Sequence, residues 1–112
     1  MHSSVTSPEA KSISANGRYY RAGSFGLKRL VSNDRRYAIV ISKRQGKAHE
    51  RNRVKRVIRE LLRHRESIIS DGLYLLYFRG LCSRMNRERI AADIDKVLET
   101  IKTGIEKEST SS

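Results

Sequence analysis

The spacing of apolar residues predicts a helix in the middle of the chain, from residue 48 to about 65. Five apolar side chains recur there at intervals of three or four residues, as one buried helical stripe requires: Val54, Val57, Ile58, Leu61 and Leu62. Gly46 separates this segment from the strand pattern before it. The other positions are mostly polar, so the predicted helix has one packing face and one face for solvent or a ligand.

A second long helix is predicted near the C-terminus, from about residue 85 to 103. Its apolar residues follow the helical period closely: Ile90, Ala91, Ile94, Val97, Leu98 and Ile101. Gly104 comes directly after this pattern, and glycine is common just past the end of a helix. We therefore expect the helix to end at Gly104.

A short helix is predicted near the N-terminus, where Ser7-Pro8-Glu9 forms a start signal. The Ser7 hydroxyl would cap the helix, proline suits the first helical position, and Glu9 puts an acid in the first turn. Asn16-Gly17 should then stop the helix after about two turns.

Three segments between the N-terminal helix and the middle helix have the composition of strands. Phe25–Val31 and Arg36–Ser42 flank the polar turn cluster 32–35, which predicts that they pair as a hairpin. Arg18–Ala22 is expected to add a short strand before this hairpin.

Two strand segments are apolar at nearly every position. They are Tyr37–Ile41, and Leu73–Phe78 after the turn Ser70-Asp71-Gly72. Such runs are typical of strands covered on both faces, so both are expected to be buried and the first to be central in its sheet.

These elements follow in the order α-β-β-β-α-β-α, which predicts an α+β sandwich around one small sheet. The 112 residues fit one domain, assigned to 7–104. The segments 1–6 and 105–112 are rich in Ser, Thr, Glu and Lys and are expected to be frayed tails. Nothing resembles a signal peptide or a membrane span, so the expected location is the cytoplasm.

Charge changes the interpretation of the middle helix, because the chain carries a formal net charge of +12. The polar positions of that helix hold mostly cations, with only Glu50 and Glu60 against them: Arg51, Arg53, Lys55, Arg56, Arg59 and Arg63. A helix kept merely soluble usually mixes its signs, so this excess predicts a polyanionic partner. Nucleic acid is favoured over a membrane, because Trp is absent and the apolar face is ordinary and aliphatic.

The helix has the chemistry that phosphate recognition needs. The planar arginine fork gives two parallel hydrogen bonds, and residues four apart put cations about 6 Å from one another along one edge. Asn52 has both donors and acceptors for a base edge or a ribose hydroxyl. Three further cations lie just before the helix, where free N–H groups and the helix dipole attract phosphate: Lys43, Arg44 and Lys47.

With these motifs the chain resembles the protein subunit of bacterial ribonuclease P. The resemblance rests on Ala38–Lys43, Gly46–Ala48 and Arg51–Arg56, followed by Arg59, Glu60 and Arg63. The family is known by a strand that ends in a Val-Ser-Lys-Lys-like stretch, a Gly-Lys-Ala-like link and an Arg-Asn-Arg helix. The matches have the right order and spacing, and the predicted order of elements extends the likeness over nearly the whole chain.

The resemblance implies an α+β fold with three helices and a small four-stranded mixed sheet. In that family the basic helix joins two parallel strands, here 36–42 and 73–79, by an uncommon left-handed crossover. The holoenzyme is an endoribonuclease whose catalyst is a large, Mg²⁺-requiring RNA that removes the 5′ leader of precursor tRNA. The implied partners are therefore the catalytic RNA and precursor tRNA, with no membrane and no obligate protein partner.

The resemblance also assigns residues to two contacts. The set that would face the catalytic RNA is Lys43, Arg44, Lys47, Arg51, Asn52, Arg53, Lys55, Arg56 and Arg59. A cleft between the sheet and the N-terminal helix would hold the single-stranded leader, usually against phenylalanines of that helix. Here the helix offers only Ile13, so the stacking candidates become Tyr19, Phe25 and Tyr37, although aromatic residues on strands more often fill a core.

No residues have the pattern of a protein nuclease site, which needs an acid–base pair or carboxylates around a metal. His49 and His64 lie four helical turns apart, too far to act together. Glu60 is expected to pair with Arg56 or Arg63 rather than to hold hydrated Mg²⁺. We therefore expect this chain to have no catalytic residue, no metal site of its own and no nuclease activity without the RNA.

Two other groups with reactive chemistry have structural explanations. Asp93 is expected to form a surface pair with Lys96. Cys82 is the only cysteine, so it is expected to be a small buried or half-buried side chain without a disulfide or a zinc site.

Two other functions stay open from the residues alone. A structural RNA-binding protein, such as a ribosomal protein, fits the charge and size equally well, although such proteins often have long basic tails. A helix-turn-helix DNA-binding protein needs a short helix directly before the recognition helix, whereas the segment before Gly46 has a strand pattern.

Overall fold

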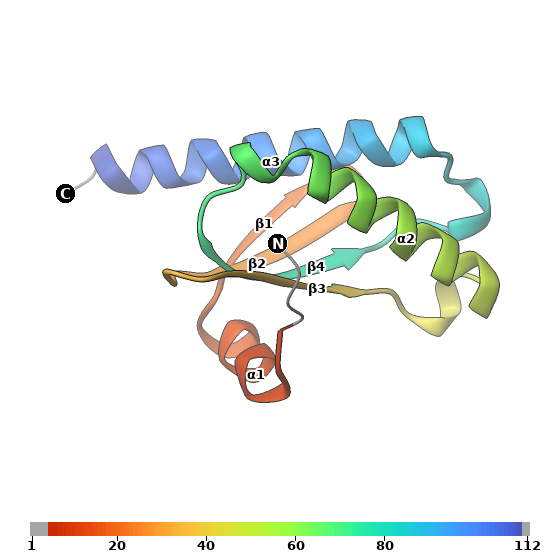
Figure 1. Ribbon diagram of the computed structural model, residues 1–112, viewed down its shortest axis with the longest axis horizontal. Helices are drawn as coiled ribbons and strands as arrows, with labels where there is room; N and C mark the ends of the chain where they lie inside the picture. Colours follow the sequence, from red (N-terminus) through yellow and green to blue (C-terminus); the bar gives the residue numbers. More distant parts are fainter. Residues whose placement is uncertain (1–4, 111–112) are drawn as a thin grey trace.

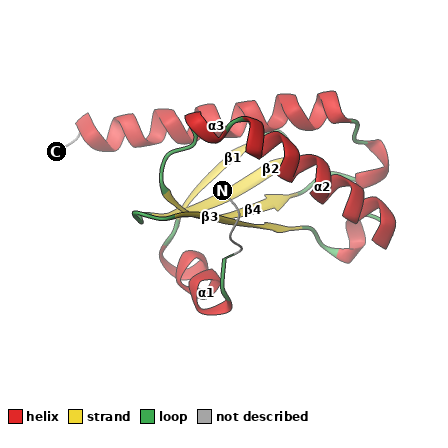
Figure 2. Cartoon of the chain, in the orientation of Figure 1, coloured by secondary structure: helices red, strands yellow, loops and turns green. Residues whose placement is uncertain are grey.

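A four-stranded sheet lies between one short helix on one face and two long helices on the other (Figures 1 and 2). The computed structural model describes residues 5–110, with side chains described through residue 105. The strands are β1 (Arg18–Ala22), β2 (Phe25–Leu30), β3 (Arg35–Val40) and β4 (Gly72–Phe78). The helices are α1 (Ser7–Asn16), α2 (Ala48–His64) and α3 (Arg87–Thr110). The predicted α+β class and the order of the elements are confirmed.

The sheet has the order β1-β2-β4-β3 and mixes two kinds of pairing. β1 with β2 and β2 with β4 are antiparallel, whereas β3 and β4 are parallel. Parallel neighbours require a crossover, and α2 supplies it over the face that it shares with α3 (Figure 1). The crossover is left-handed, as the resemblance implied.

The predicted hairpin between 25–31 and 36–42 is wrong. The tight hairpin joins β1 to β2 through Gly23, whose φ of 57° lies in the left-handed region that glycine adopts readily. β4 lies between β2 and β3, and the backbone N–H of Gly72 donates to the carbonyl of Asp34 at 2.7 Å. β2 and β3 are therefore consecutive in the chain but not paired, because the more hydrophobic β4 lies between them in the sheet.

The prediction that Tyr37–Ile41 is a central strand is also wrong. β3 is an edge strand whose side chains are half-buried, and Val40 is 41% exposed. β4 has the central place, and all but one of its seven residues are buried. The apolar runs therefore identified both strands but did not show which one is central in the sheet.

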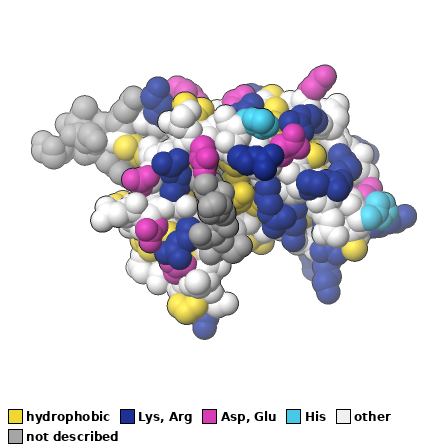
Figure 3. All heavy atoms as spheres, viewed as in Figure 1, with side chains coloured by type: hydrophobic (Ala, Val, Ile, Leu, Met, Phe, Trp, Pro, Cys, Tyr) yellow, Lys and Arg dark blue, Asp and Glu magenta, His cyan; other side chains and the backbone are white. Residues whose placement is uncertain are grey.

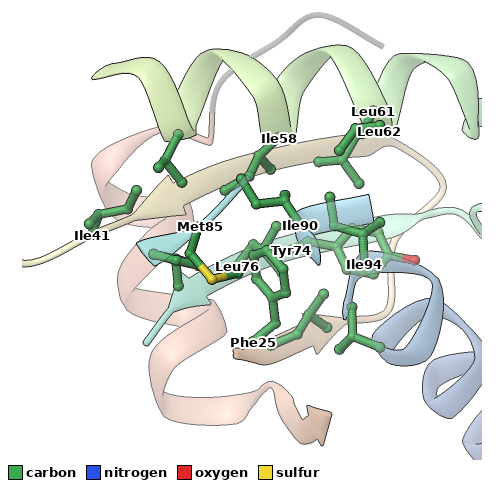
Figure 4. Close-up of a cluster of buried hydrophobic side chains, with 14 of the residues drawn as sticks. Phe25, Ile41, Ile58, Leu61, Leu62, Tyr74, Leu76, Met85, Ile90 and Ile94 are labelled. Atoms are coloured by element: carbon green, nitrogen blue, oxygen red, sulfur yellow. The ribbon is translucent and has the colours of Figure 1, made fainter. Parts of the chain in front are cut away.

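The main core lies between the sheet and the two long helices (Figure 4). Ile58 of α2 and Ile90 and Ile94 of α3 are fully buried there, and the rings of Phe25 and Phe78 pack with centroids 5.5 Å apart. Full burial of such a side chain contributes about 1.5–3 kcal/mol. A smaller cluster on the other face fixes α1, where the buried Ile13 packs with residues of β4.

The helix ends differ from their predictions in two places. Thr6, rather than Ser7, caps α1: the Glu9 N–H donates to Thr6 Oγ1 at 3.3 Å, and the Thr6 N–H donates to Glu9 Oε1 at 3.0 Å. Gly104 does not stop α3, which continues to Thr110. Residues 1–4 and 111–112 of the predicted tails lie outside the described residues, and the assignment of 7–104 as the domain stays a prediction.

Candidate RNA-binding surface

Helix α2 has the two faces that its sequence predicted. Four residues of the apolar stripe are buried and Val57 packs partly against the same core, so the stripe is confirmed: Val54, Ile58, Leu61 and Leu62. The packing fixes the orientation of the helix, and Asn52, Arg56 and Arg59 are exposed on its outer side. Lys and Arg side chains gather over the end of the molecule where α2 begins (Figure 3).

The nine residues assigned to the catalytic RNA form one continuous segment around the start of α2. Six of them are exposed: Lys43, Arg44, Lys47, Asn52, Arg56 and Arg59. Arg51, Arg53 and Lys55 are half-buried. Within residues 5–105, none of the eight cations in this set forms an ion pair with an acid. The positive charge of this surface is therefore not neutralised by the described part of the protein.

Both acids of α2 accept hydrogen bonds from groups other than the cationic side chains of this surface. Glu50 Oε1 accepts a hydrogen bond from the Lys47 N–H at 2.9 Å, which caps the helix. Glu60 accepts from Arg87 Nη2 of α3 at 3.1 Å, and this hydrogen bond and charge lower the pKa of the Glu60 carboxyl. The predicted pairing of Glu60 with Arg56 or Arg63 is wrong, because the side chain lies toward the neighbouring helix.

Arg53 differs from the other cations of this surface. Its Nη2 donates to the Cys82 carbonyl at 2.8 Å and to the Met85 carbonyl at 3.0 Å. Arg51 also has a local contact, from Nε to the Gly46 carbonyl at 3.2 Å. The sequence marked both as phosphate ligands. Helical spacing does not show that Arg51 bonds back to Gly46, or that Arg53 reaches a turn much later in the chain.

The three aromatic residues proposed for the leader do not come together. Phe25 is fully buried in the main core, so its ring is excluded from contact with RNA. Tyr37 lies on the same face of the sheet, where burial raises the pKa of its hydroxyl and nearby Arg59 partly opposes this. Tyr19 is 45% exposed and lies on the opposite face, as its alternation with the buried Tyr20 requires.

A different group of side chains gathers on the face that carries α1. Tyr77 packs at the edge of the small cluster under α1, and its register partners are Gly26 on β2 and the exposed Val40 on β3. The Arg79 guanidinium lies 5.6 Å from the centroid of the Tyr77 ring. The sequence did not single out Tyr77, because nearly every residue of β4 is apolar and the run does not show which side chains face α1.

Gly26 provides the floor between these side chains. A Cβ at that position would lie 2.6 Å from Tyr19 Oη and 3.1 Å from Arg79 Nε. The side chains of Tyr19 and Arg79 therefore both lie over the Gly26 backbone. The result is a shallow aromatic and cationic surface beside α1.

Two reactive side chains, Asp93 and Cys82, are buried in the structure. Asp93 is buried and accepts two hydrogen bonds from Ser24, so its predicted surface pair with Lys96 is wrong. No group of three or more His, Cys, Asp or Glu in this part of the chain is placed to hold a metal. Cys82 is fully buried as predicted, and this burial raises the pKa of its thiol. None of the helices in the described residues is long and apolar enough to cross a membrane.

Comparison with known proteins identifies one family. The family model described as Ribonuclease P matches residues 6–102. The ribonuclease P protein component of Chlamydia trachomatis serovar D is 46% identical over 55 residues, which cover 46% of each chain. That of Chlamydia muridarum is 46% identical over 52 residues, or 43% of each chain. The aligned part thus spans less than half the length of these curated relatives.

Solved structures share the fold. The Staphylococcus aureus RNase P protein superposes with a TM-score of 0.79 at 24% identity, covering 87% of this chain and 92% of that one. The Thermotoga maritima RNase P protein gives 0.73 at 21% identity, covering 83% and 92%. At such identities the likeness concerns the fold alone.

Proposed function

The chain belongs to the ribonuclease P family, and we propose from this premise that it is the protein component of a ribonuclease P holoenzyme. In this role it binds the catalytic RNA through the surface around the start of α2. It thereby assists the removal of the 5′ leader from precursor tRNA. Its site of action is the cytoplasm, and the family match does not support the alternative of a ribosomal protein.

One observation carries the proposal: the cations around the start of α2 have no acidic partner among residues 5–105. The two acids of α2 instead accept hydrogen bonds from the backbone N–H of Lys47 and from the side chain of Arg87. A phosphate backbone is the polyanion that matches a continuous row of Arg and Lys, and its binding releases counterions. Asn52 is exposed within the row and can hydrogen-bond a base edge or a ribose hydroxyl.

The chemistry of cleavage belongs to the RNA in this proposal. No cluster of acids, His or Cys among the described residues fits a metal, so the Mg²⁺ that the reaction needs is held by RNA groups. The protein neutralises phosphates, which lowers the concentration of Mg²⁺ required to fold and bind the RNAs. It contributes no acid, base or nucleophile.

The leader of precursor tRNA is proposed to lie on the face that carries α1. Tyr19 and Tyr77 offer aromatic surface there, and Arg79 offers a cation beside them. Base stacking on such rings contributes about 1–3 kcal/mol per base in single-strand binders. This assignment replaces Phe25 and Tyr37, which lie on the other face of the sheet.

The test is cleavage of precursor tRNA at low Mg²⁺ by a bacterial ribonuclease P RNA, with and without the protein. We expect strong stimulation at the 5′ site, and loss of this stimulation in the double variant Arg56→Glu with Arg59→Glu. The matched control is Lys96→Glu with Lys102→Glu, because these exposed cations lie on α3 away from the proposed surface. If the parent protein binds its cognate RNA without stimulating cleavage, or if both variants behave alike, the proposal fails.

A further inference from the structure

Two side chains of the segment 43–59, which carries the candidate RNA-binding surface, hold the backbone that connects β4 to α3. Gln45, which lies just before α2, donates from Nε2 to the Phe78 carbonyl at 2.5 Å and to the Gly80 carbonyl at 2.8 Å. Arg53 donates to the carbonyls of Cys82 and Met85. Three carbonyls of the connection, and that of Phe78 at the end of β4, are thus bound by the segment that carries the proposed RNA surface.

The two segments also pack without a gap between them. A Cβ on Gly46 would lie 2.9 Å from Cys82 Cβ and 3.3 Å from Cys82 Sγ. Cys82 is fully buried under this contact. The connection is therefore fixed against the beginning of α2 by hydrogen bonds on both sides of a close approach at glycine.

The outer side of the connection has the character of an RNA contact. Arg84 is exposed and forms no ion pair within residues 5–105, and Leu81 is 49% exposed. Arg87, which follows, is occupied by Glu60. In the views of Figures 1 and 3 the connection lies at the end of the molecule where the Lys and Arg side chains gather.

We infer that the connection 79–86 is a second contact element for the same RNA that binds α2. Arg84 binds a phosphate of the strand that passes the start of α2, and Leu81 packs against an unstacked base or ribose beside it. Arg53 and Gln45 are positioning residues, because their donors are used to hold the connection rather than to contact RNA. The inference rests on the proposed function, since it names a further part of the same interface.

Charge and continuity select RNA as the occupant. The unpaired cation of Arg84 continues a row of unpaired cations, so a protein partner would need a matching acidic strip. A single exposed leucine between arginines is too small an apolar surface for a stable protein interface. An exposed leucine beside arginines suits a nucleotide, whose base has apolar faces and whose phosphate is anionic.

The inference predicts a particular coupling between Arg53 and Arg84. Arg84→Ala should weaken binding of the catalytic RNA about tenfold, the loss of one charge-assisted contact, and should lower the slope of log K against log salt by about 0.7–0.9. Arg53→Ala should weaken binding and also speed amide hydrogen exchange of residues 79–86 in the free protein. In the Arg53→Ala background, Arg84→Ala should then cost much less than tenfold, because the connection is no longer held in place.

The matched cycle pairs Arg84→Ala with Arg56→Ala. Their effects on affinity should multiply, because Arg56 is exposed and forms no hydrogen bond or ion pair to the connection within residues 5–105. Lys96→Ala on α3 controls for net charge alone. Independent effects of Arg53→Ala and Arg84→Ala would show that Arg53 is itself a phosphate ligand and would overturn its positioning role. An unchanged affinity for Arg84→Ala, with weaker binding by Arg56→Ala, would overturn the second contact element alone. Failure of the parent protein to bind the RNA would overturn the proposed function instead.

Discussion

Asp93 of α3 accepts two hydrogen bonds from Ser24 in the turn between β1 and β2. The Ser24 hydroxyl donates to Asp93 Oδ2 at 2.6 Å and the Ser24 N–H donates to the same atom at 3.2 Å. The carboxylate also lies over Gly23, where a Cβ would come within 2.6 Å of Asp93 Oδ1. One buried acid thus fixes a turn that is 69 residues away in the chain.

We expect Ser24→Ala to lower the free energy of unfolding by about 1–3 kcal/mol, because Asp93 would lose its hydroxyl partner while staying buried. Chemical denaturation of the parent and the variant measures the difference. Ser12→Ala is the control, since Ser12 is exposed on α1. A Ser24→Ala protein as stable as the parent would show that the Ser24 N–H alone satisfies the acid.

Gly104 offers a second stability test, because its surroundings should reverse the usual preference for alanine over glycine inside a helix. Alanine in place of glycine inside a helix normally stabilises it by about 1 kcal/mol. Here a Cβ at 104 would lie 2.5 Å from Cε1 of the Tyr20 ring. We therefore expect Gly104→Ala to destabilise the protein by about 1–3 kcal/mol through overpacking, as measured by denaturant unfolding.

The neighbouring Thr103→Ala serves as the control, because Thr103 is exposed on the same turn of α3. It should be neutral or slightly stabilising, as alanine favours helices. Equal effects at both positions would mean that α3 shifts away from β1 without cost.

The pair Glu60–Arg87 predicts a pH dependence. Arg87 lowers the pKa of Glu60 in the folded protein below its ordinary value of 4.5. A carboxyl whose pKa is lower in the folded state adds stability above its unfolded pKa and loses it as the pH falls through the folded pKa. Parent and Glu60→Gln should therefore differ in melting temperature at neutral pH and converge as the pH falls below about 4.5.

The comparison needs a control that separates this pair from the general loss of carboxylate charges in acid. Asp95→Asn provides it, because Asp95 on α3 forms an ion pair with Arg65, the residue directly after α2. A difference between parent and Glu60→Gln that persists unchanged to pH 3 would show that the carboxylate does not contribute through its charge.

The sequence predicted elements well and long-range neighbours poorly, and β3 shows why. Its apolar run correctly indicated a strand, but edge and centre are decided by which strand has the most area to bury. Local spacing also failed for two acids, since it suggested partners for Glu60 and Asp93 within their own helices. In the structure both side chains have partners on other elements. The left-handed crossover followed only from the resemblance, because the general rule favours the opposite hand.

For the candidate site the sequence indicated the segment but not the role of each residue. Helical spacing separated the buried stripe of α2 from its cationic side. It gave no sign that Arg53 reaches Cys82 and Met85, since those carbonyls come from a turn about thirty residues later. Alternation along β4 would have identified Tyr77, but an all-apolar run conceals which residues face each side.

The proposal that Tyr77, rather than Phe25, contacts the leader can be tested directly. Tyr77→Leu keeps an apolar side chain beside the small cluster under α1 but removes the ring that Arg79 covers. If one base stacks there, the variant should bind precursor tRNA more weakly by about 1–3 kcal/mol in the holoenzyme, and mature tRNA, which has no leader, equally well. Binding titrations with both RNAs, and with leaders of increasing length, measure the difference.

Tyr37→Leu is the matched control, because Tyr37 is a half-buried tyrosine on the face that packs against α2. We expect it to reduce stability without changing the preference for precursor over mature tRNA. A preference lost in Tyr37→Leu and kept in Tyr77→Leu would place the leader on the α2 side of the sheet. The leader would then run beside Arg59 rather than across Gly26, and the α1 face would need another explanation for its exposed Tyr19 and Val40.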